Sequence, residues 1–161
     1  NSGLRRELFY LLNRSKNIIC IAPIRRFETF YFSYAKSRYK TDKIKKFVLN
    51  DLWQHWRHKT IDYLLLKKKY PKQVIIVKFE DLIRNHKNTS KKLCKNLKIK
   101  YSKIMEKSTF IGKKVLGNSS FKKDKKYIGK FYNTNPNDKF PKKLLPKEYF
   151  EILKLVNKLS I

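Results

Sequence analysis

The chain has 161 residues, the length of one domain, and 41% of them are hydrophobic and 14% aromatic. This composition excludes a disordered chain and predicts a folded protein with a single core. Forty-one Lys and Arg against twelve Asp and Glu give a formal net charge of +29, so we expect an anionic partner or substrate. A coding bias toward Lys, Asn and Ile would also produce such a charge.

Cysteine usage argues against a disulfide-stabilised scaffold, and hydropathy argues against a transmembrane helix in this sequence. Cys20 and Cys94 are too few for a disulfide framework and are expected to be small core residues. No apolar run approaches the roughly 18 residues that a transmembrane helix needs. The chain opens on Asn1 and its only methionine is Met105, so we expect that the natural N-terminus is missing.

Hydrophobic periodicity predicts elements that alternate between strand and helix. Continuous apolar runs predict buried strands over 17–21 and 74–77. Helical spacing predicts helices over 4–12, 27–38 and 44–69, near residue 82, over 89–97 and after Pro146. A turn is expected at 79–81, a loop over 110–121 and an irregular segment over 133–146. This order predicts an α/β layer structure with a parallel sheet.

The segment IICIAPIRRFETFYFS carries the first candidate site. Arg25 follows a predicted strand, and Ser33 lies eight residues later, about two turns into the next helix. Ligands of open α/β sheets bind at the carboxyl ends of the strands. A guanidinium, a hydroxyl and a nearby helix N-terminus could together hold a phosphate. The alternative is a surface arginine and an ordinary helix serine.

Two later segments contribute further candidates. VIIVKFEDL, residues 74–82, places Phe79 directly after the second strand, and TFIGKKVLGNSSF covers residues 109–121. Phe79 and Phe121 could stack on a purine ring, and the alternative is that they are core aromatics. Glu80 and Asp81 are expected to favour the start of a helix rather than to act as an acid–base pair. His55 and His58 lack further ligands at a suitable spacing, so no metal site is predicted.

These three segments, in this order, resemble the PAPS-dependent sulfotransferases, where PAPS is 3′-phosphoadenosine 5′-phosphosulfate. The resemblance implies that Arg25 and Ser33 hold the 3′-phosphate of the nucleotide. It also implies that Phe79 lies against the adenine, in place of the tyrosine that the family usually has there.

The same resemblance extends to the later part of the chain and to the fold. It implies that Ser120 and Phe121 complete the adenine pocket and that Lys130, in the stretch IGKF, reaches the 3′-phosphate. The implied fold is a partial three-layer, P-loop-NTPase-like sulfotransferase fold with a short parallel sheet flanked by helices. Residues 1–161 would then form a single sulfotransferase-like domain that lacks its N-terminal part.

The family's N-terminal strand–loop–helix, which cradles the 5′-phosphosulfate, has no equivalent before residue 17. The catalytic base is expected in that missing part, so no catalytic residue is assigned here. The usual Arg-Asp-Pro is replaced by Arg25, Arg26 and Phe27. Whether the chain alone is an active enzyme therefore stays open.

The implied function is transfer of a sulfuryl group from PAPS to a hydroxyl or amine, without a metal. The implied partners are PAPS or its product PAP (adenosine 3′,5′-bisphosphate) and an anionic or hydroxylated acceptor, glycans included. One alternative is a basic nucleic-acid-binding module, suggested by the +29 charge and the interleaved Tyr and Phe. The other is an inactive sulfotransferase fragment.

Overall fold

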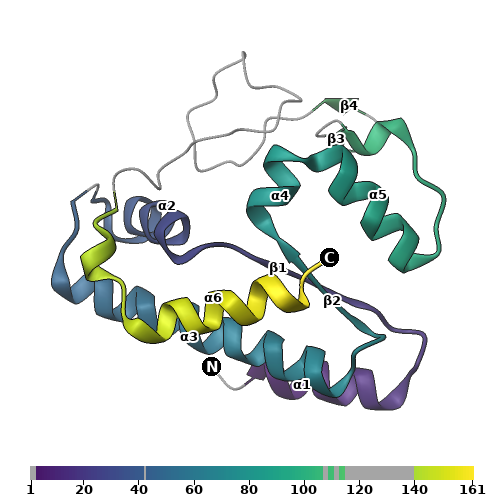
Figure 1. Cartoon of the computed structure of the whole chain (residues 1–161), viewed down its shortest axis with the longest axis horizontal. Coiled ribbons are helices and arrows are strands. Elements are labelled where there is room, and N and C mark those ends of the chain that lie inside the picture. Colours follow the sequence, from purple (N-terminus) through teal and green to yellow (C-terminus); the bar gives the residue numbers. More distant parts are fainter. Residues whose placement is uncertain (1–2, 42, 107–108, 111–112, 115–139) are drawn as a thin grey trace. The chain divides into compact units, whose positions relative to one another are not determined.

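The computed structural model describes residues 3–41, 43–106, 109–110, 113–114 and 140–161 (Figure 1). The chain divides into two compact units, one formed by Asn1–Lys78 with Pro136–Ile161 and the other by Phe79–Asn135. The prediction of a single domain is not tested by this division and stays a prediction.

The first unit contains most of the helices. They are α1 (Gly3–Arg14), α2 (Phe27–Tyr39), α3 (Lys46–Lys69), the short 3₁₀ helix η4 (Lys142–Leu144) and α6 (Lys147–Leu159). The helices predicted in these regions are confirmed, with ends within two residues of the predicted ones for α2 and α3. Pro146 occupies the N-cap position of α6, directly before the first turn, and provides no side-chain cap.

A small parallel sheet lies beside these helices. Strand β1 (Cys20–Ile24) pairs with β2 (Val74–Lys78) in a register that runs from Cys20 opposite Val74 to Ile24 opposite Lys78. On the other side of β2, Ser160 forms a parallel bridge with Ile76, and the N–H of Ile161 donates to the Ile76 carbonyl. The protein is thus mostly helical with a two-stranded parallel sheet, which confirms the general α/β class.

The first strand lies three residues later than predicted. Its pairing starts where the N–H of Cys20 donates to the Gln73 carbonyl, at 2.7 Å. Upstream of that point, the carbonyls of Ser15 and Ile18 accept hydrogen bonds from the Gln73 side chain instead of from a strand. The apolar residues 18–19 therefore precede the sheet, although their sequence resembles the strand itself.

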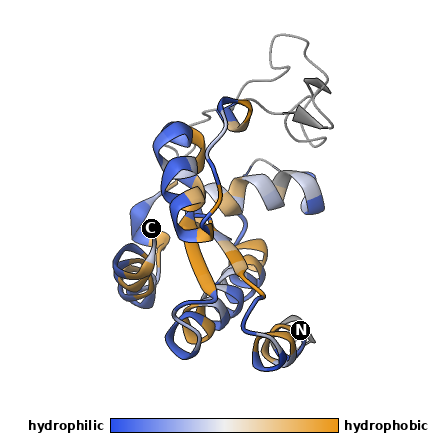
Figure 2. Cartoon of the chain, turned by 90° about the vertical axis from the view of Figure 1, so that its right-hand side faces the viewer, coloured by the Kyte–Doolittle hydropathy of each residue, from blue (hydrophilic) through white to orange (hydrophobic). Residues whose placement is uncertain are grey.

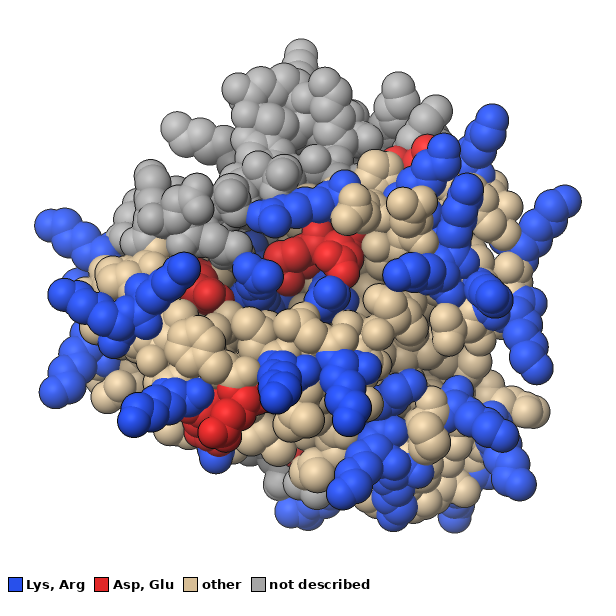
Figure 3. Space-filling model, viewed as in Figure 1, with Lys and Arg blue, Asp and Glu red and all other residues tan. Residues whose placement is uncertain are grey.

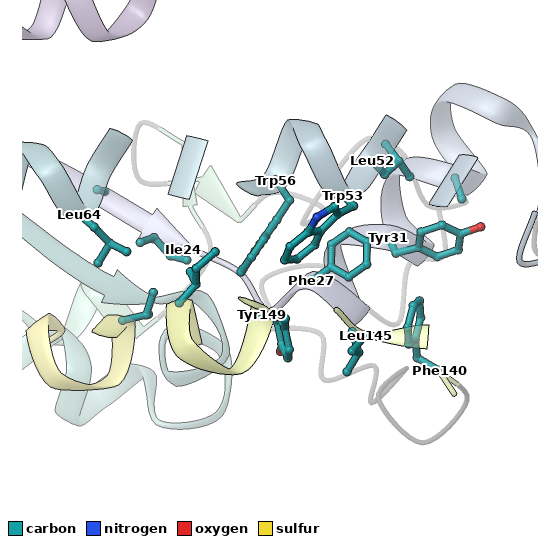
Figure 4. Close-up of a cluster of buried hydrophobic side chains, with 14 of the residues drawn as sticks. Ile24, Phe27, Tyr31, Leu52, Trp53, Trp56, Leu64, Phe140, Leu145 and Tyr149 are labelled. Carbon is teal, nitrogen blue, oxygen red and sulfur yellow. The ribbon is translucent and has the colours of Figure 1, made fainter. Parts of the chain in front are cut away.

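The core of the first unit combines aliphatic side chains with a cluster of aromatic rings (Figure 4). Phe27, at the start of α2, is fully buried, and its ring contacts those of five other aromatic residues: Phe30, Tyr31, Trp53, Trp56 and Phe140. Tyr149 of α6 adds a contact with Trp56. Interlocked rings of this kind bury large apolar areas and favour edge-to-face geometry. The core therefore anchors the first turn of α2.

Amphipathic sequences explain why these helices pack as they do. In α6 the buried residues Tyr149, Ile152 and Val156 recur at helical spacing, so one face meets the core and the other faces water. Arg57 of α3 and Glu148 of α6 add an ion pair at 2.7 Å. Figure 2 shows the orange, apolar strands beside helices that are partly blue and partly orange.

The second unit contains α4 (Phe79–Arg84), α5 (His86–Leu97), the 3₁₀ helix η1 (Lys103–Glu106) and a pair of two-residue antiparallel strands, β3 (Thr109–Phe110) and β4 (Lys113–Lys114). The turn predicted at 79–81 is wrong, because β2 passes directly into α4 at Phe79. A loop was predicted over 110–121, and the structure has β3 and β4 paired within and beside that range.

Candidate functional site

Arg25 lies at the carboxyl end of the parallel sheet. Strand β1 ends at Ile24, so Arg25 is the first residue beyond it, and it is half-buried. Helix α2 begins two residues later, at Phe27. The prediction that Arg25 stands between a strand and a helix N-terminus is confirmed. This is the place where α/β proteins bind phosphorylated ligands.

The main chain and the side chain of Arg25 are both held by hydrogen bonds. The indole N–H of Trp56, on α3, donates to the Arg25 carbonyl oxygen at 2.6 Å. The Nε–H of Arg25 donates to Oγ1 of Thr29 at 3.0 Å. Thr29 is itself buried, and its hydroxyl donates to the carbonyl of Arg26, also at 3.0 Å. The guanidinium therefore has a defined orientation relative to α2.

Ser33 lies on the same face of α2 as Thr29. The two residues are four positions apart, and residues at this spacing are neighbours on a helix surface, about 6 Å apart along the axis. Ser33 is half-buried. Arg25, Thr29 and Ser33 thus follow one line from the strand end along the helix. Arg25 contacts Thr29, which sequence reasoning overlooked, and helical spacing places Ser33 one turn beyond Thr29 on the same face.

The N-terminus of α2 adds a partial positive charge to this site. Arg26 stands at the N-cap position and provides no side-chain cap. Glu28, in the first turn, is the acidic group nearest in sequence, and its carboxylate accepts a hydrogen bond from the hydroxyl of Tyr149 at 2.6 Å. A cationic fork, a serine hydroxyl and a helix N-terminus can hold a phosphate dianion and orient it.

The other predicted site residues lie elsewhere. Phe79 is the half-buried first residue of α4, in the second unit. Ser120, Phe121 and Lys130 lie outside the described residues. Their roles in an adenine pocket and at a 3′-phosphate stay predictions. Glu80 and Asp81 occupy the first turn of α4, where negative charge favours a helix start.

His55 forms a second polar feature, beside α2. Its ring stacks on Phe30 and lies against Tyr34, and within the described part of the chain its buried Nε2 has no hydrogen-bond partner. Burial, with Lys59 and Arg38 nearby, lowers the pKa of His55. Over the same described residues, no three His, Cys, Asp or Glu side chains group in a way that could hold a metal ion.

The described surface is strongly basic. Figure 3 shows Lys and Arg spread between other residues across the described part of the visible face, with Asp and Glu in a few patches. Helix α5 carries exposed lysines at four positions and no acidic residue: Lys87, Lys91, Lys92 and Lys95. In the part of the chain that is described, no helix is both long enough and apolar enough to cross a bilayer. The charge favours anionic ligands in general and does not select one.

Sequence reasoning missed Thr29 and Trp56 as parts of the site. Thr29 stands four residues after Arg25 and four before Ser33, and this regular spacing was the available signal. Trp56 gave none, because its contact with the Arg25 carbonyl spans 31 residues of sequence. Its place in an apolar stripe indicated only that it would be buried.

Comparison with known proteins gives no relative. No protein-family model, no curated protein and no solved structure matches the chain.

Proposed function

We propose that this chain forms the nucleotide-binding part of a PAPS-dependent sulfotransferase. The observation that carries the proposal is the line of Arg25, Thr29 and Ser33 at the carboxyl end of a parallel strand, with the arginine oriented by a buried hydroxyl. In the resembling family an arginine and a serine at this spacing hold the 3′-phosphate. The donor is PAPS and the product is PAP.

The chemistry of the 3′-phosphate suits this arrangement. The guanidinium can donate two parallel hydrogen bonds to a phosphate dianion, and the hydroxyl of Ser33 can donate a third. The N-terminus of α2, two residues beyond Arg25, favours the same negative charge. A nucleotide without a 3′-phosphate would leave these donors without their anion. The site would therefore select PAP over adenosine 5′-monophosphate.

The finer fold belongs to the same proposal. Arg25 and Phe79 each follow directly on a strand, and those two strands pair in parallel, with Ile24 opposite Lys78. This supports a partial P-loop-like sulfotransferase fold. In it Phe79, Ser120 and Phe121 would contact the adenine and Lys130 the 3′-phosphate.

The complete reaction would be an in-line transfer. The sulfuryl group leaves the phosphate oxygen of PAPS for a hydroxyl or amine of the acceptor, whose proton passes to a general base. Such a transfer depends on positioning and on stabilising the transferred negative charge. The basic surface fits an anionic acceptor such as a glycan.

Replacing Arg25 with Ala tests the phosphate-binding role. We expect the affinity for PAP to fall by about 1.5–3 kcal/mol, the range for hydrogen bonds to charged groups. Affinity for adenosine 5′-monophosphate should change little. Isothermal titration calorimetry with both nucleotides measures the difference.

Arg38→Ala is the matched control, because Arg38 is an exposed arginine on α2, the helix that begins two residues after Arg25. It also removes one positive charge and should leave the preference for PAP intact. Equal affinity of Arg25→Ala and the unaltered chain for PAP would contradict the proposal.

The rival function, a nucleic-acid-binding module, is favoured by the acid-free helix α5 and its exposed lysines. Binding of this kind falls steeply with salt and tolerates any sequence. If the chain ignores PAP and binds RNA of unrelated sequences with such a salt dependence, the rival holds.

A further inference from the structure

We propose that Thr29 is a positioning residue for the nucleotide's 3′-phosphate. Its hydroxyl fixes the plane of the Arg25 guanidinium, so that the phosphate is met by the two terminal amino groups of the fork. This role rests on the proposed function of Arg25. It goes beyond it by assigning a task to a residue that does not itself touch the phosphate.

The hydroxyl of Thr29 has one hydrogen and two lone pairs. Its hydrogen points to the Arg26 carbonyl, so toward Arg25 the oxygen can only accept. It accepts from Nε, with a separation of 3.0 Å. The direction of both hydrogen bonds is therefore fixed by chemistry, and the guanidinium cannot rotate away from α2 without breaking one of them.

This contact decides which edge of the fork meets an anion. A guanidinium can present either Nε with one terminal nitrogen, or its two terminal nitrogens. Since Nε donates to Thr29, the bidentate contact falls to the terminal pair. The Trp56 indole holds the carbonyl of the same residue, so Arg25 is oriented at both ends. A lysine has no Nε–H of this kind and could not be positioned in the same way.

A valine at position 29 would remove this contact with little damage to the helix. Thr29 is 5% exposed, and valine has nearly its shape. The Arg26 carbonyl also accepts from the N–H of Phe30 at 2.9 Å, so it keeps a partner without the hydroxyl. The buried ring of Phe27 continues to anchor the first turn. Loss of orientation can thus be separated from loss of structure.

The experiment compares Thr29→Val with Thr29→Ser, which keeps the hydroxyl, by titration calorimetry with PAP and adenosine 5′-monophosphate. For Thr29→Val we expect about a fivefold loss of PAP affinity, within the range for one hydrogen bond, and less than about a twofold change for the monophosphate. Thr29→Ser should bind PAP within about twofold of the unaltered chain. A purely structural role would weaken both nucleotides alike.

A double-mutant cycle with Arg25→Lys shows whether Thr29 acts through Arg25. In the lysine background, Thr29→Val should cost less than about a twofold further loss, because the coupled partner is already gone. Nitrogen NMR of the arginine Nε–H, recorded without nucleotide, should show faster solvent exchange at Arg25 in Thr29→Val only. Additive losses in the cycle, or an unchanged Nε–H, overturn the positioning role alone. Absence of any preference for PAP in the unaltered chain overturns the proposed function and this role together.

Discussion

The two units of the chain are stabilised by different kinds of side chain. In the first unit, large rings from α2, α3 and α6 interlock, and Phe27, Tyr31 and Tyr149 are almost fully buried. Among the described residues of the second unit, the buried side chains are small: Thr89, Ser90 and Cys94. Their side-chain contacts include a hydrogen bond from Thr89 to the Asp81 carbonyl and a sulfur contact between Cys94 and Met105.

This difference suggests a division of tasks. Buried apolar area is the main source of folding free energy, so the buried rings of the first unit stabilise the segment that carries Arg25. The described part of the second unit buries little, and regions of that kind open locally at low free-energy cost.

The largest effect is expected for Phe27→Ala. The ring is fully buried among aromatic neighbours, so its loss should lower the free energy of unfolding by about 3–5 kcal/mol. Urea unfolding followed by circular dichroism measures the change. Phe47→Ala, at a position that is 74% exposed, is the control and should stay within about 0.5 kcal/mol. Similar losses at both positions would refute the assignment of the core.

A smaller effect is expected for Cys94→Ala in the second unit. Cys94 is 2% exposed and contacts the Met105 sulfur at 3.5 Å, so its removal should cost about 1 kcal/mol. Amide hydrogen exchange should show lower protection in α5, with α3 unchanged, because the two units differ in local stability. If Cys94→Ala lowered the free energy of unfolding as much as Phe27→Ala, the core of the second unit would contribute as much stability as that of the first.

The smallest effect concerns pH and lies in the first unit. The folded pKa of His55 is lowered below its ordinary value of 6.5, so the unfolded chain binds the proton more readily. The free energy of unfolding should therefore rise with pH toward 6.5 and fall as the pH drops below it. His55→Phe removes the titrating group and should flatten this part of the slope, as measured by urea midpoints at pH 5.5 and 7.5.

The control for this prediction is His58→Gln, at an exposed position on the same helix. It should leave the slope contributed by His55 in place. A slope that disappears in His58→Gln and persists in His55→Phe would show that the wrong histidine was assigned.

Periodicity predicted the helices well and the site only in part. The stripes of α2 and α3 depend on local spacing, which a sequence displays directly. The start of β1 depends on where Cys20 meets Gln73, a contact that spans 53 residues, so the predicted strand was three residues early. The start of α4 was predicted too late, because a turn was expected at 79–81 between the strand and the helix. In the structure α4 begins at Phe79, directly after β2. The regular spacing of Arg25, Thr29 and Ser33 could have pointed to Thr29, but the Arg25–Thr29 hydrogen bond depends on the direction of the arginine side chain, which the sequence does not display.

The hydrogen bonds that hold the end of α1 depend on the side-chain amide of Gln73, a group that can be lost by deamidation. Its amide nitrogen reaches the carbonyls of Leu12, Ser15 and Ile18, and two hydrogens are shared among these three oxygens. Hydrolysis of that amide, with loss of ammonia, would leave a carboxylate, which offers no hydrogen and repels carbonyl oxygens. Deamidation of Gln73 would thereby replace attraction by repulsion between this side chain and the segment that joins α1 to β1. The aromatic cluster of the core would not be altered by this reaction.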